Sequence, residues 1–198
     1  MNRPFCGLLA LILAAASASG AEQERIADLY GRGLAGDEKA VIDCIAALEA
    51  RLKTRPDDQL ARVYLGSAWT LRSRDLSISP GKLSALRKGI ALMDEAAAAA
   101  PNDAKVLLLR AVTEEALPVF LGRRKAAREQ LDELVGLLEK DPLKLSPADQ
   151  QLLYLNAGEA AQRAGEKARA RALWERGLAI AADAKLKAEI HTALKEAK

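Results

Sequence analysis

Pairs of adjacent acidic residues are the first groups in this sequence that could do chemistry, because paired carboxylates can act as general acid and base. Three such pairs are Asp37/Glu38, Asp57/Asp58 and Glu114/Glu115. The first two pairs fall where helices are expected to begin, and negative charge there complements the helix dipole. Glu114/Glu115 falls inside an expected helix. Their position at helix starts therefore accounts for the first two of these pairs without catalysis.

Nucleophiles and metal ligands are scarce. Cys44 lies between Val41 and Ile45 on an apolar helical face, which predicts a buried, inert thiol rather than a reactive one. His191 is the only histidine, so we expect it at the surface and do not expect a zinc site. The sequence has no serine nucleophile elbow, no glycine-rich phosphate loop and no HExxH motif. We predict a protein that is not an enzyme and needs no cofactor or metal.

The first residues are typical of a secretory signal peptide. Arg3 precedes an apolar run over 7–16, and small residues follow at 19–21. The alternative, a membrane anchor, needs about 20 apolar residues, which is more than this run supplies. We expect residues 1–21 to be removed, leaving a single domain over 22–198 that is exported, with a bacterial periplasm as its destination.

Charge and composition narrow the class of protein. Removing the signal peptide takes away one arginine and no acid, so the formal charge falls from +3 to +2. This balance predicts no nucleic-acid partner, and membrane contact only through the signal peptide before cleavage. Only Cys44 remains after cleavage, because Cys6 lies in the signal peptide. A lipidated cysteine follows the apolar run of its signal peptide, whereas Cys6 precedes it, so lipidation is not expected. Aromatic residues make up only 4% of the chain, which favours packed helices over a β-sandwich.

Prolines divide the chain into long helical segments. Pro56, Pro101 and Pro142 each follow a helical pattern, at spacings of 45 and 41 residues, with a second break inside each interval. This is typical of a helix-hairpin repeat. The expected helices span 22–35, 37–54, 58–74, 80–99, 103–117, 123–140, 147–164, 166–182 and 184–197, the last as a terminal cap.

Two stretches carry the small and bulky residues of a known repeat. Leu65-Gly66, followed by Trp69, resembles the Leu-Gly-x₂-Tyr element of the tetratricopeptide repeat. The second copy, over 157–177, has Gly158 in the first helix, a turn at 165–166 and Trp174 at the phenylalanine position of the second helix. The chain resembles exported bacterial proteins of the tetratricopeptide (TPR) superfamily, with diagnostic residues only in 56–101 and 147–182.

The resemblance implies an all-α fold, a right-handed α-solenoid of about four TPR-like hairpins plus a C-terminal capping helix. Gly66 would lie where two helices of a hairpin cross most closely, since a Cβ there would separate their backbones. Trp69 and Trp174 would fill the core beside such crossings, although either could instead stack on a ligand.

The same resemblance suggests where a partner would bind. First helices line the concave face of such a solenoid. The residues expected there are Ser67, Thr70, Glu115, Glu159 and Gln162, with Tyr30, Val112 and Leu155 as apolar neighbours. The face could equally be a solvated surface.

Two long turns, over 72–82 and 117–125, are the other candidate surfaces. The second carries Phe120 beside Arg123 and Arg124, a combination that could hold an acidic partner or lipid headgroups. A self-packed loop followed by a solvated basic helix start is the alternative.

Together these features predict a non-catalytic exported TPR-like adaptor that binds a protein or peptide partner in the cell envelope. The alternative is a periplasmic small-ligand carrier or transporter accessory subunit, which would require an enclosed apolar cavity.

Overall fold

The computed structural model describes residues 6–141, 144–180 and 182–197, with side chains from Gly20 onward. Throughout this part of the chain the secondary structure is helical, and no strand occurs in it. The predicted all-α class is confirmed. The predicted signal peptide lies largely outside the described side chains, although the backbone from Cys6 is helical.

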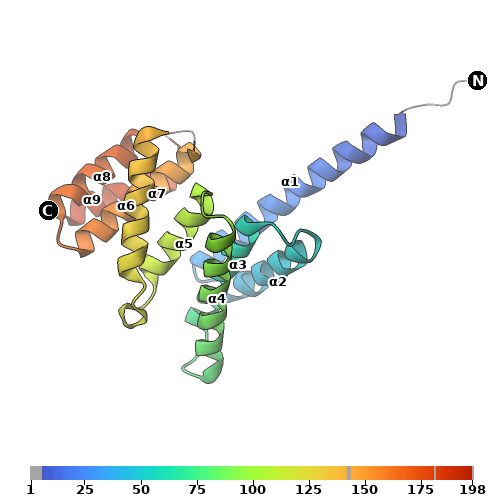
Figure 1. Ribbon diagram of the computed structural model, residues 1–198, viewed down its shortest axis with the longest axis horizontal. Coiled ribbons are helices and arrows are strands. Elements are labelled where there is room, and N and C mark those ends of the chain that lie inside the picture. Colours follow the sequence, from blue (N-terminus) through green and yellow to red (C-terminus); the bar gives the residue numbers. More distant parts are fainter. Residues whose placement is uncertain (1–5, 142–143, 181, 198) are drawn as a thin grey trace, which may run out of the picture. The chain divides into compact units, whose positions relative to one another are not determined.

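The chain forms two compact units, residues 1–93 and 94–198, and the boundary falls within one helix. The helices are α1 (Cys6–Leu34), α2 (Glu38–Thr54), α3 (Gln59–Asp75), α4 (Pro80–Ala99), α5 (Ala104–Ala116), α6 (Arg124–Lys140), α7 (Pro147–Arg163), α8 (Lys167–Ala179) and α9 (Ala184–Glu196), and a 3₁₀ turn, η1 (Val119–Leu121), lies between α5 and α6 (Figure 1).

Side-chain caps fix most helix starts near the expected positions. Asp37 accepts a hydrogen bond from the backbone N–H of Ala40, and Asp58 does the same for Ala61. Asp103 and Asp183 cap α5 and α9 in the same way. Each cap satisfies a backbone donor that the helix itself leaves free. The predicted position of Asp37/Glu38 and Asp57/Asp58 at helix starts is confirmed, and one residue of each pair is the N-cap.

In the first unit, α1, α2 and α3 pack against one another around a core that includes Cys44 and Leu48. Helices α3 and α4 touch through glycine. A Cβ built on Gly66 would lie 2.7 Å from the carbonyl oxygen of Gly89 and 3.0 Å from the backbone nitrogen of Met93. The predicted close crossing at Gly66 is confirmed. Trp69 packs against the edge of this core, with the ammonium of Lys88 3.9 Å from its ring centroid.

In the second unit, each helix from α5 to α8 packs against its successor, and α7 also contacts α5 and α9 (Figure 1). Gly158 in α7 leaves room for the indole of Trp174 in α8, and that indole N–H donates to the carbonyl oxygen of Leu155 at 3.1 Å. Trp174 is buried, so its prediction as a core residue is confirmed. Gly177 lets Ile190 of α9 approach in turn.

Some boundaries differ from the predictions. Helix α1 begins at Cys6 instead of near residue 22, and α8 ends at Ala179 instead of 182. The turn η1 was not expected. Within the described residues, no helix combines the length and the apolar character needed to span a bilayer.

Candidate functional site: the α7–α9 groove and the α5–α6 connector

An open groove runs between α7 and α9. Its acidic lining consists of Glu159 from α7 with Glu189 and Glu196 from α9. Ala188 and Ala193 are its apolar lining, and Lys185 and Thr192 also contribute. The groove therefore offers several carboxylates, a single cation and small side chains that leave space above the helix backbones. We call this the α7–α9 groove.

Glu115 and Glu159, two of the predicted site residues, are linked through Arg163. The Nε atom of Arg163 donates to Oε1 of Glu115 at 3.0 Å, and its Nη1 lies 3.5 Å from Oε2 of Glu159. Glu115 is only 2% exposed, so the prediction that it lines an open surface is wrong for this side chain. Its buried carboxylate instead binds Arg163, and Arg163 in turn contacts the carboxylate of Glu159 in the groove.

Ser67 and Thr70 also differ from the prediction of an open lining, because both are buried. The hydroxyl groups of Tyr30 and Ser67 are hydrogen-bonded at 2.7 Å, and Thr70 donates to the carbonyl oxygen of Ser67. Their hydroxyls serve packing within the first unit, since a buried hydroxyl needs a hydrogen-bond partner.

The remaining predicted lining residues lie in the second unit. Val112 and Gln162 are partly exposed, whereas Leu155 is buried in the core. Glu159 is the predicted lining residue that borders the α7–α9 groove.

The α5–α6 connector, residues 117–123, exposes an apolar tip. Phe120 is 83% exposed and Val119 67% exposed, so of the two alternatives that the sequence left open the turn is the exposed one and not the self-packed loop. Backbone hydrogen bonds from Leu121 to Pro118 and from Gly122 to Val119 close the turn. Gly122 has a φ of 68°, which favours glycine, and it ends the 3₁₀ turn.

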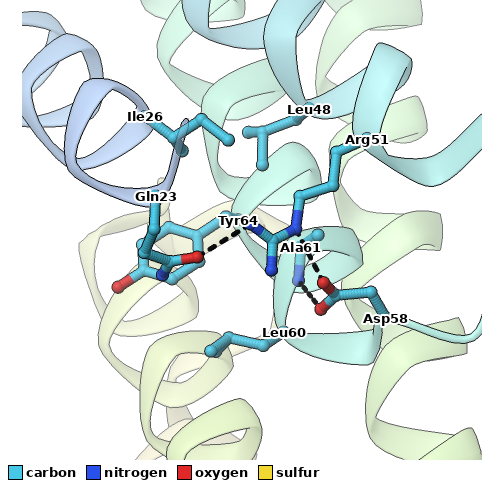
Figure 2. Close-up of a pocket in the computed structure, with 8 residues that line it drawn as sticks. All are labelled: Gln23, Ile26, Leu48, Arg51, Asp58, Leu60, Ala61 and Tyr64. Carbon is cyan, nitrogen blue, oxygen red and sulfur yellow. Dashed lines mark hydrogen bonds and ion pairs between the residues drawn. The ribbon is translucent and has the colours of Figure 1, made fainter. Parts of the chain in front are cut away.

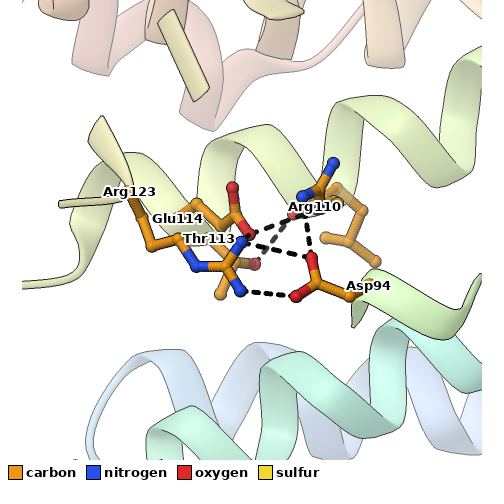
Figure 3. A network of polar contacts seen from close by, with 6 residues as sticks. Asp94, Arg110, Thr113, Glu114 and Arg123 are labelled. Carbon is orange, nitrogen blue, oxygen red and sulfur yellow. Dashed lines mark hydrogen bonds and ion pairs between the residues drawn. The ribbon is translucent and has the colours of Figure 1, made fainter. Parts of the chain in front are cut away.

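Ion pairs fasten the base of this connector (Figure 3). Arg123 donates to both carboxylate oxygens of Asp94, and Arg110 donates to Asp94 at 2.7 Å. Glu114, which is fully buried, lies 3.3 Å from Arg110 Nε and 3.4 Å from Arg123 Nη1. Arg124 donates through Nε to the carbonyl oxygen of Leu117. Arg123 and Arg124 thus hold the turn in place in addition to contributing positive charge.

Burial raises the pKa of Glu114, and the neighbouring guanidinium groups of Arg110 and Arg123 only partly oppose this effect. Burial therefore disfavours the charged form of this carboxyl group. Its role is structural, because the contacts described for it go to arginines that hold helix ends together.

A small pocket in the first unit lies beside the ion pair of Arg51 and Asp58 (Figure 2). Arg51 donates to Asp58 at 2.7 Å and to Gln23 at 2.8 Å, so the polar groups around the pocket bind one another. It has room for about one water molecule, which is too little for a metabolite.

The groups that could have supplied chemistry lie apart. Cys44 is buried, and burial raises the pKa of its thiol to about 11, which agrees with the inert thiol predicted. His191 is exposed on α9, as predicted. Among the described residues, no group of three or more His, Cys, Asp or Glu side chains could hold a metal ion.

Comparison with protein-family models, with curated proteins and with solved structures finds no match for this chain. The geometry of its own residues is therefore the basis for a functional proposal.

Sequence reasoning missed Arg163 and the α9 side of the groove. Lys185, Glu189, Thr192 and Glu196 are spaced by four, three and four residues, which places them on one helical face. That spacing was visible in the sequence. The contact of Arg163 with Glu115 was not, because the two residues are 48 positions apart.

Proposed function

We propose that this protein is a non-catalytic exported adaptor of TPR-like architecture, and that its α7–α9 groove binds an extended, basic segment of a partner protein. The observation that carries the proposal is the groove itself, in which Glu159, Glu189 and Glu196 surround small side chains. Lysine or arginine side chains of a peptide would pair with these carboxylates, while its backbone would lie over Ala188 and Ala193.

The order of helix contacts supports this architecture. Helix α7 contacts both α5 and α9, so alternate helices of the second unit lie next to each other. In a right-handed solenoid of about four TPR-like hairpins, α5 and α7 would be the first helices of successive hairpins and α9 would be the capping helix. First helices would line the concave face, and the α7–α9 groove would lie at the capped end of that face.

Specificity would come from charge and from the fixed position of Glu159. Arg163 is anchored to the buried Glu115 and lies beside Glu159, so the side chains of Arg163 and Glu159 are restrained before a peptide binds. A preorganised surface loses less conformational entropy on binding. The half-exposed carboxylate of Glu159 keeps its outer side available to a partner.

The carrier alternative receives less support. A small-ligand carrier needs an enclosed apolar cavity, whereas the α7–α9 groove is open and the pocket of the first unit holds about one water molecule.

Selection of peptides from a random phage-displayed library on the immobilised protein tests the proposal. We expect the recovered peptides to be enriched in lysine and arginine, and to bind a Glu159→Lys/Glu189→Lys variant at least about tenfold more weakly. A variant carrying Glu175→Lys on the exposed face of α8 is the matched control and should bind as the parent does. Recovery of peptides without a basic bias, or equal binding to all three proteins, would refute the proposal.

A further inference from the structure

The α5–α6 connector combines two features that the groove does not use. Its tip is apolar, with Pro118, Val119 and Phe120 all exposed. Between Glu115 and Glu129 the sequence contains no acid, but it does contain four basic residues, which are Arg123, Arg124, Lys125 and Arg128. An apolar tip is thus followed directly by a basic helix start.

Not all of that positive charge is neutralised within the protein. Arg123 is paired with Asp94 and Glu114, but Arg124 donates to the carbonyl oxygen of Leu117, which carries no formal charge. Lys125 is 89% exposed and lies 3.9 Å from Glu129 on the next turn, a contact that contributes little in water. The first turn of α6 therefore presents net positive charge behind the tip.

The tip is also held in one conformation. Gly122 and the two backbone hydrogen bonds of η1 close the turn, and the Arg123–Asp94 contacts fix its base. Exposing two large apolar side chains on an ordered turn is unfavourable in water and is explained if they become covered.

We propose that the α5–α6 connector docks on an anionic lipid bilayer, with Val119 and Phe120 entering the interface and Arg124 and Lys125 contacting lipid headgroups. A bilayer needs no complementary pocket. It requires only apolar side chains at the leading point and cations just behind them, which is the order found along this segment. A single turn of this kind gives weak, reversible attachment.

This inference does not depend on the groove proposal, because it concerns a different surface and a different class of partner. The small net charge of the whole chain does not reveal the site, since the acid-free run is local. The sequence-based expectation of membrane contact through the signal peptide alone would then be too narrow.

Fluorescence from the connector tests the proposal without interference from binding by the N-terminal segment. A Cys6→Ser chain carrying Val119→Cys is labelled with an environment-sensitive fluorophore, while the buried Cys44 stays unlabelled. With vesicles of equal parts phosphatidylglycerol and phosphatidylcholine we expect a blue shift at position 119. The same label at Ile78→Cys, an even more exposed apolar position on another connector, should not respond.

Variants separate the apolar and the electrostatic contributions. Phe120→Ala should weaken vesicle binding about tenfold, because the large apolar side chain that the bilayer would bury is lost. Lys125→Glu together with Arg124→Gln should nearly abolish it, whereas Lys167→Glu at the start of α8 should leave it unchanged. Raising the salt to about 1 M should release the tip, because the screening length falls to about 3 Å.

Absence of a blue shift at position 119, an equal shift at position 78, or an equal shift at position 119 with pure phosphatidylcholine would overturn the proposal. None of these results would affect the peptide-selection test of the groove.

Discussion

Gly66 of α3 and Gly89 of α4 cross so closely that neither can carry a side chain. A Cβ on Gly66 would lie 2.7 Å from the carbonyl oxygen of Gly89, and a Cβ on Gly89 would lie 2.6 Å from the carbonyl oxygen of Gly66. On both sides backbone atoms are among the obstacles, and they cannot rotate away as the neighbouring side chains of Met93 and Thr70 can. This reciprocal contact fixes how α3 and α4 pack in the first unit.

Replacing Gly66 by alanine should therefore destabilise the protein although alanine is the better helix former. We expect a loss of about 1 to 3 kcal/mol in the free energy of unfolding, because α3 and α4 must separate. Gly31→Ala in α1 is the matched control. It meets open space and should gain up to about 1 kcal/mol. Urea denaturation followed by circular dichroism measures both, and equal effects of the two substitutions would contradict the crossing.

The contact between Glu115 and Arg163 predicts a cost for removing the arginine. Arg163→Ala would leave the buried carboxylate without its ion-pair partner, at about 1 to 3 kcal/mol. Arg171→Ala on the exposed face of α8 should change stability by less than about 0.5 kcal/mol. In a Glu115→Gln background the cost of Arg163→Ala should shrink, which a double-mutant cycle would show. A cycle with no coupling would mean that the two residues do not interact.

The burial of Glu114 predicts a pH effect of definite sign. The pKa of Glu114 is raised in the folded protein, so the folded chain holds this proton more tightly than the unfolded chain. Its contribution to stability is fully present below about pH 4.3, its unfolded pKa, and is lost as the pH rises through the folded pKa.

Glu114→Gln cannot titrate, so it isolates this contribution. Relative to the variant, the parent protein should lose stability as the pH is raised from about 4 to about 7. Urea denaturation of both chains across that range gives the difference. A difference that stays constant, or that grows in favour of the parent with rising pH, would be inconsistent with a raised pKa.

Cys44 should report the opening of the first unit. Burial raises the pKa of its thiol to about 11, so little thiolate is present at pH 8 and reagent cannot reach it. In a Cys6→Ser chain, reaction with a thiol-specific reagent should follow the rate of unfolding and become fast in urea. Reaction in buffer at the rate of a free peptide thiol would show that Cys44 is not enclosed.

The helices could be predicted from the sequence because their signals are local. Asp37, Asp58 and Asp103 cap helices at the expected positions, and proline or glycine lies before each of them. The glycine and tryptophan of the second hairpin also predicted a contact correctly, since Gly158 faces the indole of Trp174. These features need only neighbouring turns or a single hairpin.

The site was harder to predict because its polar contacts join distant residues. Glu115 was expected at the surface, but its partner Arg163 lies far along the chain and the pair is drawn inward. Arg123 was expected to be available for a partner, and instead it binds Asp94 and Glu114. A charged side chain on a helix face can point to solvent or to a buried counter-charge, and its spacing alone does not distinguish the two.

Photocrosslinking tests the proposed groove most directly. A photoreactive amino acid at Thr192 lies in the α7–α9 groove, and one at Arg171 lies on the exposed face of α8. With a lysine-rich peptide recovered from the library, we expect crosslinking from position 192, its loss in the Glu159→Lys/Glu189→Lys variant, and none from position 171. Crosslinking from position 171 but not from 192 would contradict the proposed site.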